Sequence, residues 1–114
     1  MTTLDEQDVE GVRVLRISGS LTQQGVDQIG TAFEAAVPDG GRAVVDLGDV
    51  DLITTPGLTL FISATQRMRN TQGRVVFTAA KGIVLDLIKR CRLDEVLEIE
   101  GDRKRAVETA KHSR

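Results

Sequence analysis

Short apolar runs alternate along this chain with stretches in which apolar residues recur at helical spacing. The apolar runs occupy residues 12–18, 43–47, 74–79 and 96–99. The stretches of helical spacing cover residues 22–37, 56–70, 82–92 and 102–111. Strands that alternate with helices are joined by crossovers and form a mostly parallel sheet. The alternation therefore predicts an α/β fold.

The chain begins with a further strand, residues 3–9, whose acidic side chains suit an exposed sheet edge. Glu10 and Gly11 predict a turn, so this strand and residues 12–18 are expected to form a hairpin. The complete order is β-β-α-β-α-β-α-β-α, and the hairpin makes the sheet mixed. A length of 114 residues without a linker or repeat fits a single domain, residues 1–114.

The apolar stripes of the two middle helices predict where the core lies. The side chains expected to pack on the sheet are Phe61, Ile62, Leu87 and Ile88. Cys91 falls on the stripe of Leu87 and Ile88, so we expect a buried small hydrophobe rather than a reactive thiol. It is the one cysteine of the chain, which excludes an intrachain disulfide.

One loop carries two adjacent hydroxyl groups, Thr54 and Thr55, between a buried strand and a helix. Pro56 has the fixed φ and the missing N–H that suit the first helical position, so Thr55 is the expected N-cap. Gly57 allows another part of the backbone to approach closely. The helix dipole and the first-turn N–H groups favour an anion such as a phosphate here. A capped helix start with no further role is the alternative.

The overall charge bears on which partners the chain can have. With 15 basic and 17 acidic residues, the net charge of −2 favours neither nucleic acid nor an anionic membrane surface. Trp and Tyr are both absent, so the chain lacks those platforms for stacking bases. No apolar run approaches the roughly 18 residues of a membrane span, and the N-terminus lacks the apolar core of a signal peptide. We therefore expect a cytoplasmic protein that does not insert into a membrane.

Catalysis finds little support among the residues. The one histidine, His112, lies in the tail without an acidic or thiol partner nearby in sequence, so a Ser-His-Asp triad is not expected. Asp46, Asp49 and Asp51 form a carboxylate cluster. A metal would need these oxygens to converge, whereas we expect Asp46 at a strand end and the other two in a solvated turn. The sequence thus predicts no enzyme, no metal site and no cofactor.

Four segments together are typical of one family. The first runs Val44-Val45-Asp46-Leu47, then Val50, Leu52-Ile53, Gly57 and Leu58. The others are Ile17-Ser18-Gly19-Ser20-Leu21-Thr22, Gly73-Arg74-Val75-Val76-Phe77 and residues 84–97. On these segments, nearly the whole chain resembles the STAS domain family, which includes sulfate transporter domains and anti-sigma-factor antagonists. The resemblance implies a mixed, mostly parallel sheet with helices packed mainly on one face.

In anti-sigma-factor antagonists of this family, the loop typically reads Asp-Ser-Ser-Gly or Asp-Ser-Thr-Gly, and the residue after the Asp is phosphorylated. The resemblance places Thr55 at this phosphoacceptor position, Thr54 at the Asp position and Pro56 at the second hydroxyl position. Thr22 stands where many members carry another Asp, and Thr54 is a second candidate acceptor. The implied partner-binding loop comprises Thr22, Thr54, Thr55, Pro56, Gly57 and Leu58.

The resemblance implies a regulatory binding module. As an anti-sigma-factor antagonist, the chain would bind an anti-sigma factor whose histidine-kinase-like ATPase domain acts as a serine/threonine kinase, and so release a sigma factor. A phosphate on Thr55 adds about −2 charge and would disrupt an interface built for a neutral hydroxyl. The alternative is a non-phosphorylated adaptor or scaffold subunit of a larger sensory or lipid-transport complex, which the missing acidic pair favours. Two further possibilities stay open, a small ligand bound at the loop and a homodimer.

Overall fold

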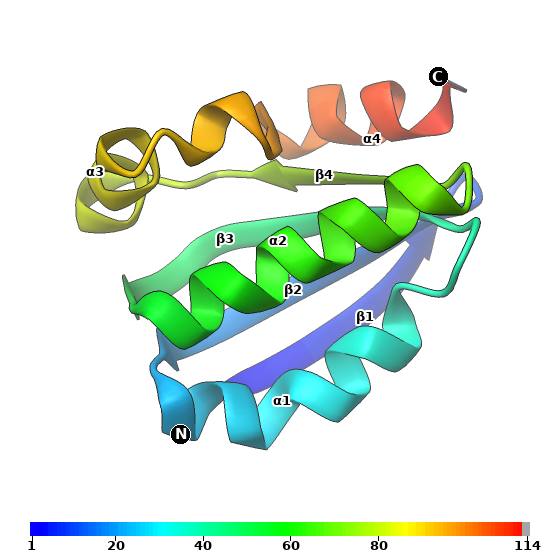
Figure 1. Ribbon diagram of the computed structural model, residues 1–114. Coiled ribbons are helices and arrows are strands. Elements are labelled where there is room, and N and C mark those ends of the chain that lie inside the picture. Colours follow the sequence, from blue (N-terminus) through cyan, green and yellow to red (C-terminus); the bar gives the residue numbers. More distant parts are fainter. Residues whose placement is uncertain (113–114) are drawn as a thin grey trace.

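The computed structural model describes residues 1–112, which form a five-stranded sheet and four α-helices (Figure 1). The strands are β1 (Thr3–Val9), β2 (Val12–Leu21), β3 (Arg42–Ile53), β4 (Arg74–Thr78) and β5 (Glu98–Glu100). The helices are α1 (Gln23–Ala36), α2 (Thr55–Asn70), α3 (Gly82–Arg90) and α4 (Arg103–Lys111), with a 3₁₀ turn at Leu93–Glu95. This order confirms the predicted mixed α/β fold.

The strands lie in the sheet in the same order as in the chain. β1 pairs with β2 antiparallel through the turn at Glu10 and Gly11, which both have positive φ, and every other pair is parallel. Because parallel strands end at the same edge of a sheet, the β2–α1 and β3–α2 connections meet there. The two loops that carry Thr22, Thr54 and Thr55 are thus brought together.

β2 and β3 are longer than the sequence predicts. The expected end of the second strand at residue 18 is wrong, because β2 continues to Leu21 beside an equally extended β3. Two register shifts interrupt this stretch, and Gly19 has a φ of +108°, so the apolar alternation is lost although the pairing is kept. Asp49 and Asp51 are therefore strand residues with exposed side chains, and their predicted place in a turn is wrong.

Helices α1, α2 and α3 pack on one face of the sheet and enclose the larger core. Three rings lie at its centre: the Phe33 and Phe61 centroids are 6.0 Å apart, and those of Phe61 and Phe77 are 4.7 Å apart. Phe61 and Ile88 are fully buried as predicted, whereas Ile62 and Leu87 are half-buried at the margin of this core. The helical spacing thus identified the correct faces, with Ile62 and Leu87 at their edges.

Helix α4 packs alone on the opposite face. Ala106, Val107 and Ala110 cover a patch of valines from β2, β3 and β4. Beside this patch Asp46 binds Arg103 at 2.8 Å from within β3, so its predicted place at a strand end is wrong.

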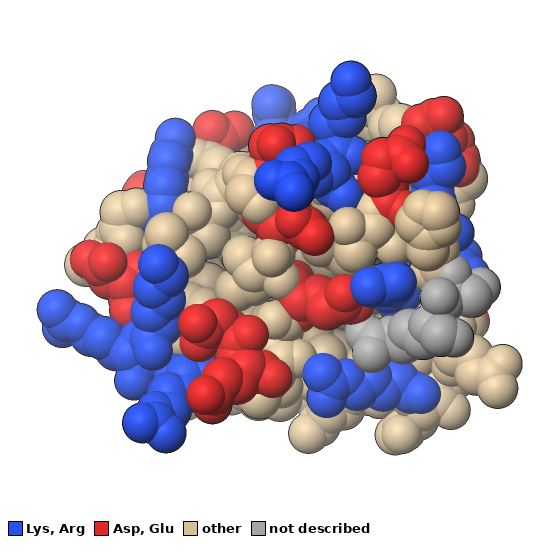
Figure 2. All heavy atoms as spheres, turned by 90° about the horizontal axis from the view of Figure 1, so that it is seen from above, with Lys and Arg blue, Asp and Glu red and all other residues tan. Residues whose placement is uncertain are grey.

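Figure 2 views the side of the molecule on which α4 lies and shows Lys and Arg side chains interspersed with Asp and Glu. Its described residues therefore offer no broad basic surface of the kind that nucleic acids need.

Cys91 departs from its prediction, because its side chain is exposed. Helix α3 ends at Arg90, and Arg92 takes a left-handed conformation with φ of 56°. Cys91 is the C-cap of α3, beside the half-buried Leu87 at the margin of the core. Over residues 1–112, none of the helices combines the length and apolar character that crossing a membrane requires.

Candidate functional site

The loop between β3 and α2 is fastened to the end of β2 by one residue. The Thr54 N–H donates to the Leu21 carbonyl at 3.1 Å, and the Thr54 hydroxyl donates to the same oxygen at 3.3 Å. The Thr54 side chain is half-buried. Its hydroxyl therefore serves as a tie between two loops and is turned inward.

Helix α2 begins one residue earlier than predicted. Thr54 is the N-cap, Thr55 is the first helical residue and Pro56 the second, so the assignment of Thr55 as N-cap is wrong. The Thr54 carbonyl accepts from the N–H groups of Gly57, at 3.0 Å, and Leu58, at 3.1 Å. Proline is tolerated throughout the first turn because its missing N–H has no helical partner there. The side chain of Thr54 makes no cap hydrogen bond.

The arrangement of the first turn of α2 also makes the site less favourable for an anion than the sequence predicts. Pro56 has no N–H, and the N–H of Gly57 is already used by the Thr54 carbonyl. The first turn therefore presents fewer donors than an ordinary helix start. The helix dipole is left as the main attraction for a negative charge at Thr55.

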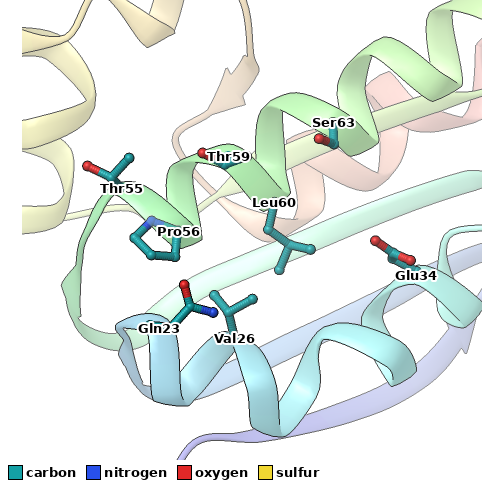
Figure 3. A pocket seen from close by; sticks show the side chains of 8 residues that line it. All are labelled: Gln23, Val26, Glu34, Thr55, Pro56, Thr59, Leu60 and Ser63. Atoms are coloured by element: carbon teal, nitrogen blue, oxygen red, sulfur yellow. The ribbon is translucent and has the colours of Figure 1, made fainter.

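Thr55 is the accessible member of the threonine pair. Thr55 is exposed, and Figure 3 shows its hydroxyl at the start of α2, directed away from α1. The Thr54 oxygen, in contrast, is held against Leu21. Of the two hydroxyls singled out from the sequence, the one on Thr55 is the more open to another protein.

Gly57 and Leu58 fix the position of the loop by close packing against the rest of the molecule. A Cβ added to Gly57 would lie 2.8 Å from Ile53 Cγ1 and 2.9 Å from both the Leu21 carbonyl oxygen and the Leu21 Cβ. These separations are closer than real Cβ contacts, so a side chain here would force the two loops apart. Leu58 is 9% exposed and contributes to the larger core.

Thr22 occupies the neighbouring loop as the N-cap of α1. Its hydroxyl oxygen accepts from the Gly25 N–H at 3.3 Å, an ordinary cap for threonine. Because Thr22 directly follows Leu21, whose carbonyl receives both donors of Thr54, the two threonine loops are adjacent. Neither Thr22 nor Thr54 brings a negative charge to the site.

The carboxylates near this edge bind separate partners. Asp51 accepts from the Ser20 hydroxyl at 2.7 Å, and Asp49 lies 3.5 Å from Arg16. Together with the Asp46–Arg103 pair, this places the three aspartates on different partners. Across residues 1–112, no three His, Cys, Asp or Glu side chains are grouped so that they could hold a metal ion. The Ser20–Asp51 contact was not predicted, because it depends on the extended pairing of β2 and β3.

The perturbed titrating groups lie in other parts of the molecule. The carboxylates of Asp8 and Glu6 raise the pKa of Arg13, and that of Glu98 raises the pKa of Arg74. Hydrogen bonds to Glu108 and Glu10 raise the pKa of Lys111. All three cations belong to ion pairs of the sheet or of α4. They therefore do not point to proton chemistry at the threonine loop.

A groove between α1 and α2 runs from Thr55 along the surface (Figure 3). It is open to solvent and has a volume of about 440 Å³. Its lining residues are Gln23, Val26, Glu34, Thr55, Pro56, Thr59, Leu60 and Ser63. It could not be predicted from the sequence, since it forms between two separate helices, α1 and α2.

The fold agrees with the comparison to known families. Residues 3–99 match the family described as "Mlab, STAS domain". The match spans well over half of the chain, and the protein belongs to the STAS domain family.

Similar individual proteins include anti-sigma factor antagonists. The BtrV protein of Bordetella bronchiseptica, whose name places it among the anti-sigma factor antagonists, is 27% identical over 88 residues, which are 76% of this chain and 74% of BtrV. A crystal structure of an anti-sigma factor antagonist from Mycobacterium paratuberculosis superposes with a TM-score of 0.88 at 20% identity, over 98% of this chain and 96% of that one.

SpoIIAA, another anti-sigma factor antagonist, has the same fold. Its unphosphorylated form matches with a TM-score of 0.72 at 14% identity, over 96% of this chain and 98% of SpoIIAA. The phosphorylated form of SpoIIAA from Bacillus matches with a TM-score of 0.68 at 14% identity, over 94% of this chain and 98% of that one. At these identities the two solved structures show a shared fold.

Proposed function

We propose that this protein is an anti-sigma-factor antagonist that binds an anti-sigma factor through its threonine loop. The observation that carries the proposal is the placement of Thr55, an exposed hydroxyl at the first position of a helix, held out by the inward-turned Thr54. Membership of the STAS family and the names of BtrV and the Mycobacterium protein support it. The function is one of binding, and the chain is acted on rather than catalytic.

The proposed control is phosphorylation of Thr55 by the anti-sigma factor itself, through a histidine-kinase-like ATPase domain. A phosphate would add about −2 charge to a loop whose exposed residues, Thr55 and its neighbours, are uncharged. The donor-poor start of α2 could not neutralise this charge with backbone N–H groups. The charge would therefore stay at the surface, where it opposes an interface formed with a neutral hydroxyl.

A direct assay tests both parts. The purified chain is mixed with the kinase-type anti-sigma factor of its own organism, with and without ATP, and followed by calorimetry and peptide mass spectrometry. We expect a complex without ATP, and with ATP a phosphate on Thr55 that is absent from Thr55→Ala and still present in Thr54→Ala. Absence of any complex with such a factor would overturn the proposal.

A second function has its own supporting observation. Thr54 and Thr22 occupy the two positions at which many antagonists carry Asp, so neither position supplies an acidic group to the site. This favours a non-phosphorylated adaptor or scaffold subunit of a larger sensory or transport complex. A stable complex that forms without any phosphate transfer to Thr55 would select this function. Genes for membrane transport components beside that of this protein would favour it too.

A further inference from the structure

We infer that the groove between α1 and α2 seats an amphipathic segment of the protein partner, with an apolar side chain between Val26 and Leu60 and a basic side chain at Glu34. This inference deepens the proposed function and rests on it for the identity of the partner. It adds a second contact area beside the loop and assigns the chemistry of what fills it.

The middle of the groove is apolar. Val26 from α1 and Leu60 from α2 point toward one another across it, and Pro56 lies beside them (Figure 3). Val26 is half-buried and Leu60 is 8% exposed, so an inserted side chain would complete a partly formed contact with little rearrangement. A volume of about 440 Å³ has room for more than one side chain. The occupant is therefore apolar at this point.

One end of the groove is acidic. Glu34 is the one charged side chain among its lining residues, and it is exposed. Within residues 1–112 no ion pair of Glu34 is found, whereas Arg67, one turn beyond Ser63, is paired with Asp39 at 3.2 Å. The exposed residues of α1 include Asp27 and Glu34 but no basic residue. A Lys or Arg on the occupant matches this charge.

The two ends of the groove differ in chemistry, and one end is formed by residues of the threonine loop. Thr55 and Pro56 line one end, and Glu34 lines the other (Figure 3). The apolar part of the occupant then packs next to Thr55, while its basic group is held at the far end. The Thr55 hydroxyl itself is directed away from α1, so a phosphate there would lie beside this end of the groove and outside its apolar middle.

Two short peptides with the same leucine spacing serve as probes, one with lysines and one with glutamates at its polar positions. Binding is measured by calorimetry, and the site is mapped from backbone amide shifts in nuclear magnetic resonance spectra. We expect the lysine peptide to shift Val26, Leu60 and Ser63 and to bind at least about tenfold more tightly than the glutamate peptide.

Matched variants separate the groove from the rest of the surface. Ser63→Trp fills the groove from an exposed position and should weaken the lysine peptide at least about tenfold, whereas Ala35→Trp adds the same ring to an exposed site of α1 outside the groove and should not. Glu34→Gln should weaken it about threefold or more, whereas Glu108→Gln on α4 should not. Amide spectra of each variant check that the fold is kept.

Several outcomes would overturn the inference. Equal binding of both peptides, shifts confined to another face, or no effect of Ser63→Trp would each reject the assigned occupant. Self-association that is lost in Ser63→Trp would assign the groove to a second copy of this chain instead. If the chain binds its anti-sigma factor but Ser63→Trp and Glu34→Gln leave that affinity unchanged, the groove inference fails and the proposed function stands. If the lysine peptide occupies the groove but no anti-sigma factor binds, the proposed function fails and the partner is of another kind.

Discussion

Two adjacent threonines with the same side chain have different surroundings in this protein. The Thr54 hydroxyl is used inside the molecule, where it donates to the Leu21 carbonyl. The Thr55 hydroxyl is exposed at the first helical position. Removing the first should therefore affect the stability of the loop, and changing the second should affect what the loop binds.

Thr55→Glu should separate binding from folding. An acidic side chain in the first turn of a helix gains about 0.3–1 kcal/mol from the dipole, so the variant should unfold at nearly the same denaturant concentration as the wild type. Binding to the anti-sigma factor should weaken at least about tenfold, or roughly 1.4 kcal/mol. Calorimetry that shows undiminished affinity would reject the phosphorylation switch.

Thr55→Ala is the matched control for this variant. Because Thr55 is not the N-cap, its truncation should change the free energy of unfolding by no more than about 0.5 kcal/mol. Partner affinity should be largely kept, since the loop stays neutral. A loss of more than about 1 kcal/mol in urea denaturation would indicate a capping role after all.

Gly57→Ala tests the close contact of the two loops. The new Cβ would lie 2.8 Å from Ile53 Cγ1 and 2.9 Å from the Leu21 carbonyl oxygen, so the loops must separate. Overpacking of this kind costs about 1–3 kcal/mol, more than the better helix propensity of alanine returns. Urea denaturation measures the loss. Gly30→Ala on α1, whose Cβ would meet nothing closer than 3.7 Å, is the control and should not be destabilising.

At the scale of elements, the two middle helices allow buried and half-buried positions to be compared. Phe61→Ala should cost about 3–5 kcal/mol, because Phe61 is fully buried and its ring packs between Phe33 and Phe77. Ile62→Ala, one residue further on at the margin of the core, should cost clearly less. Denaturant melts of the pair check this order, and equal losses would contradict the observed orientation of α2.

At the scale of the whole molecule, the three aspartates of β3 predict how the protein responds to divalent cations. Asp46, Asp49 and Asp51 contact Arg103, Arg16 and Ser20 respectively and do not converge. Millimolar magnesium or calcium should therefore leave the thermal midpoint of unfolding almost unchanged. A rise of several degrees in a thermal scan would mean that the folded state binds the ion, because such a ligand must stabilise it.

The sequence by itself determined the order of strands and helices, the hairpin and the core-facing stripes. These depend on local periodicity and turn residues, as in the helical spacing of Val26, Ile29, Phe33 and Ala36, of which Val26 is half-buried and the other three are buried. The Thr-Thr-Pro-Gly loop was also found this way, because a hydroxyl, a proline and a glycine at a helix start form a local signal. The role of each residue within the loop, in contrast, depends on contacts with distant segments.

Only the tertiary structure decided how the site is built. The pairing of β2 with β3 extended both strands past the glycines and brought Leu21 to Thr54, which made Thr54 the N-cap and left Thr55 free. Cys91, the C-cap of α3, lies exposed although it shares the apolar stripe of that helix. The groove beside Thr55 exists because α1 and α2 lie side by side on the sheet and both line it. Each of these depends on contacts between segments that are distant in sequence, and no local pattern of residue types encodes such contacts.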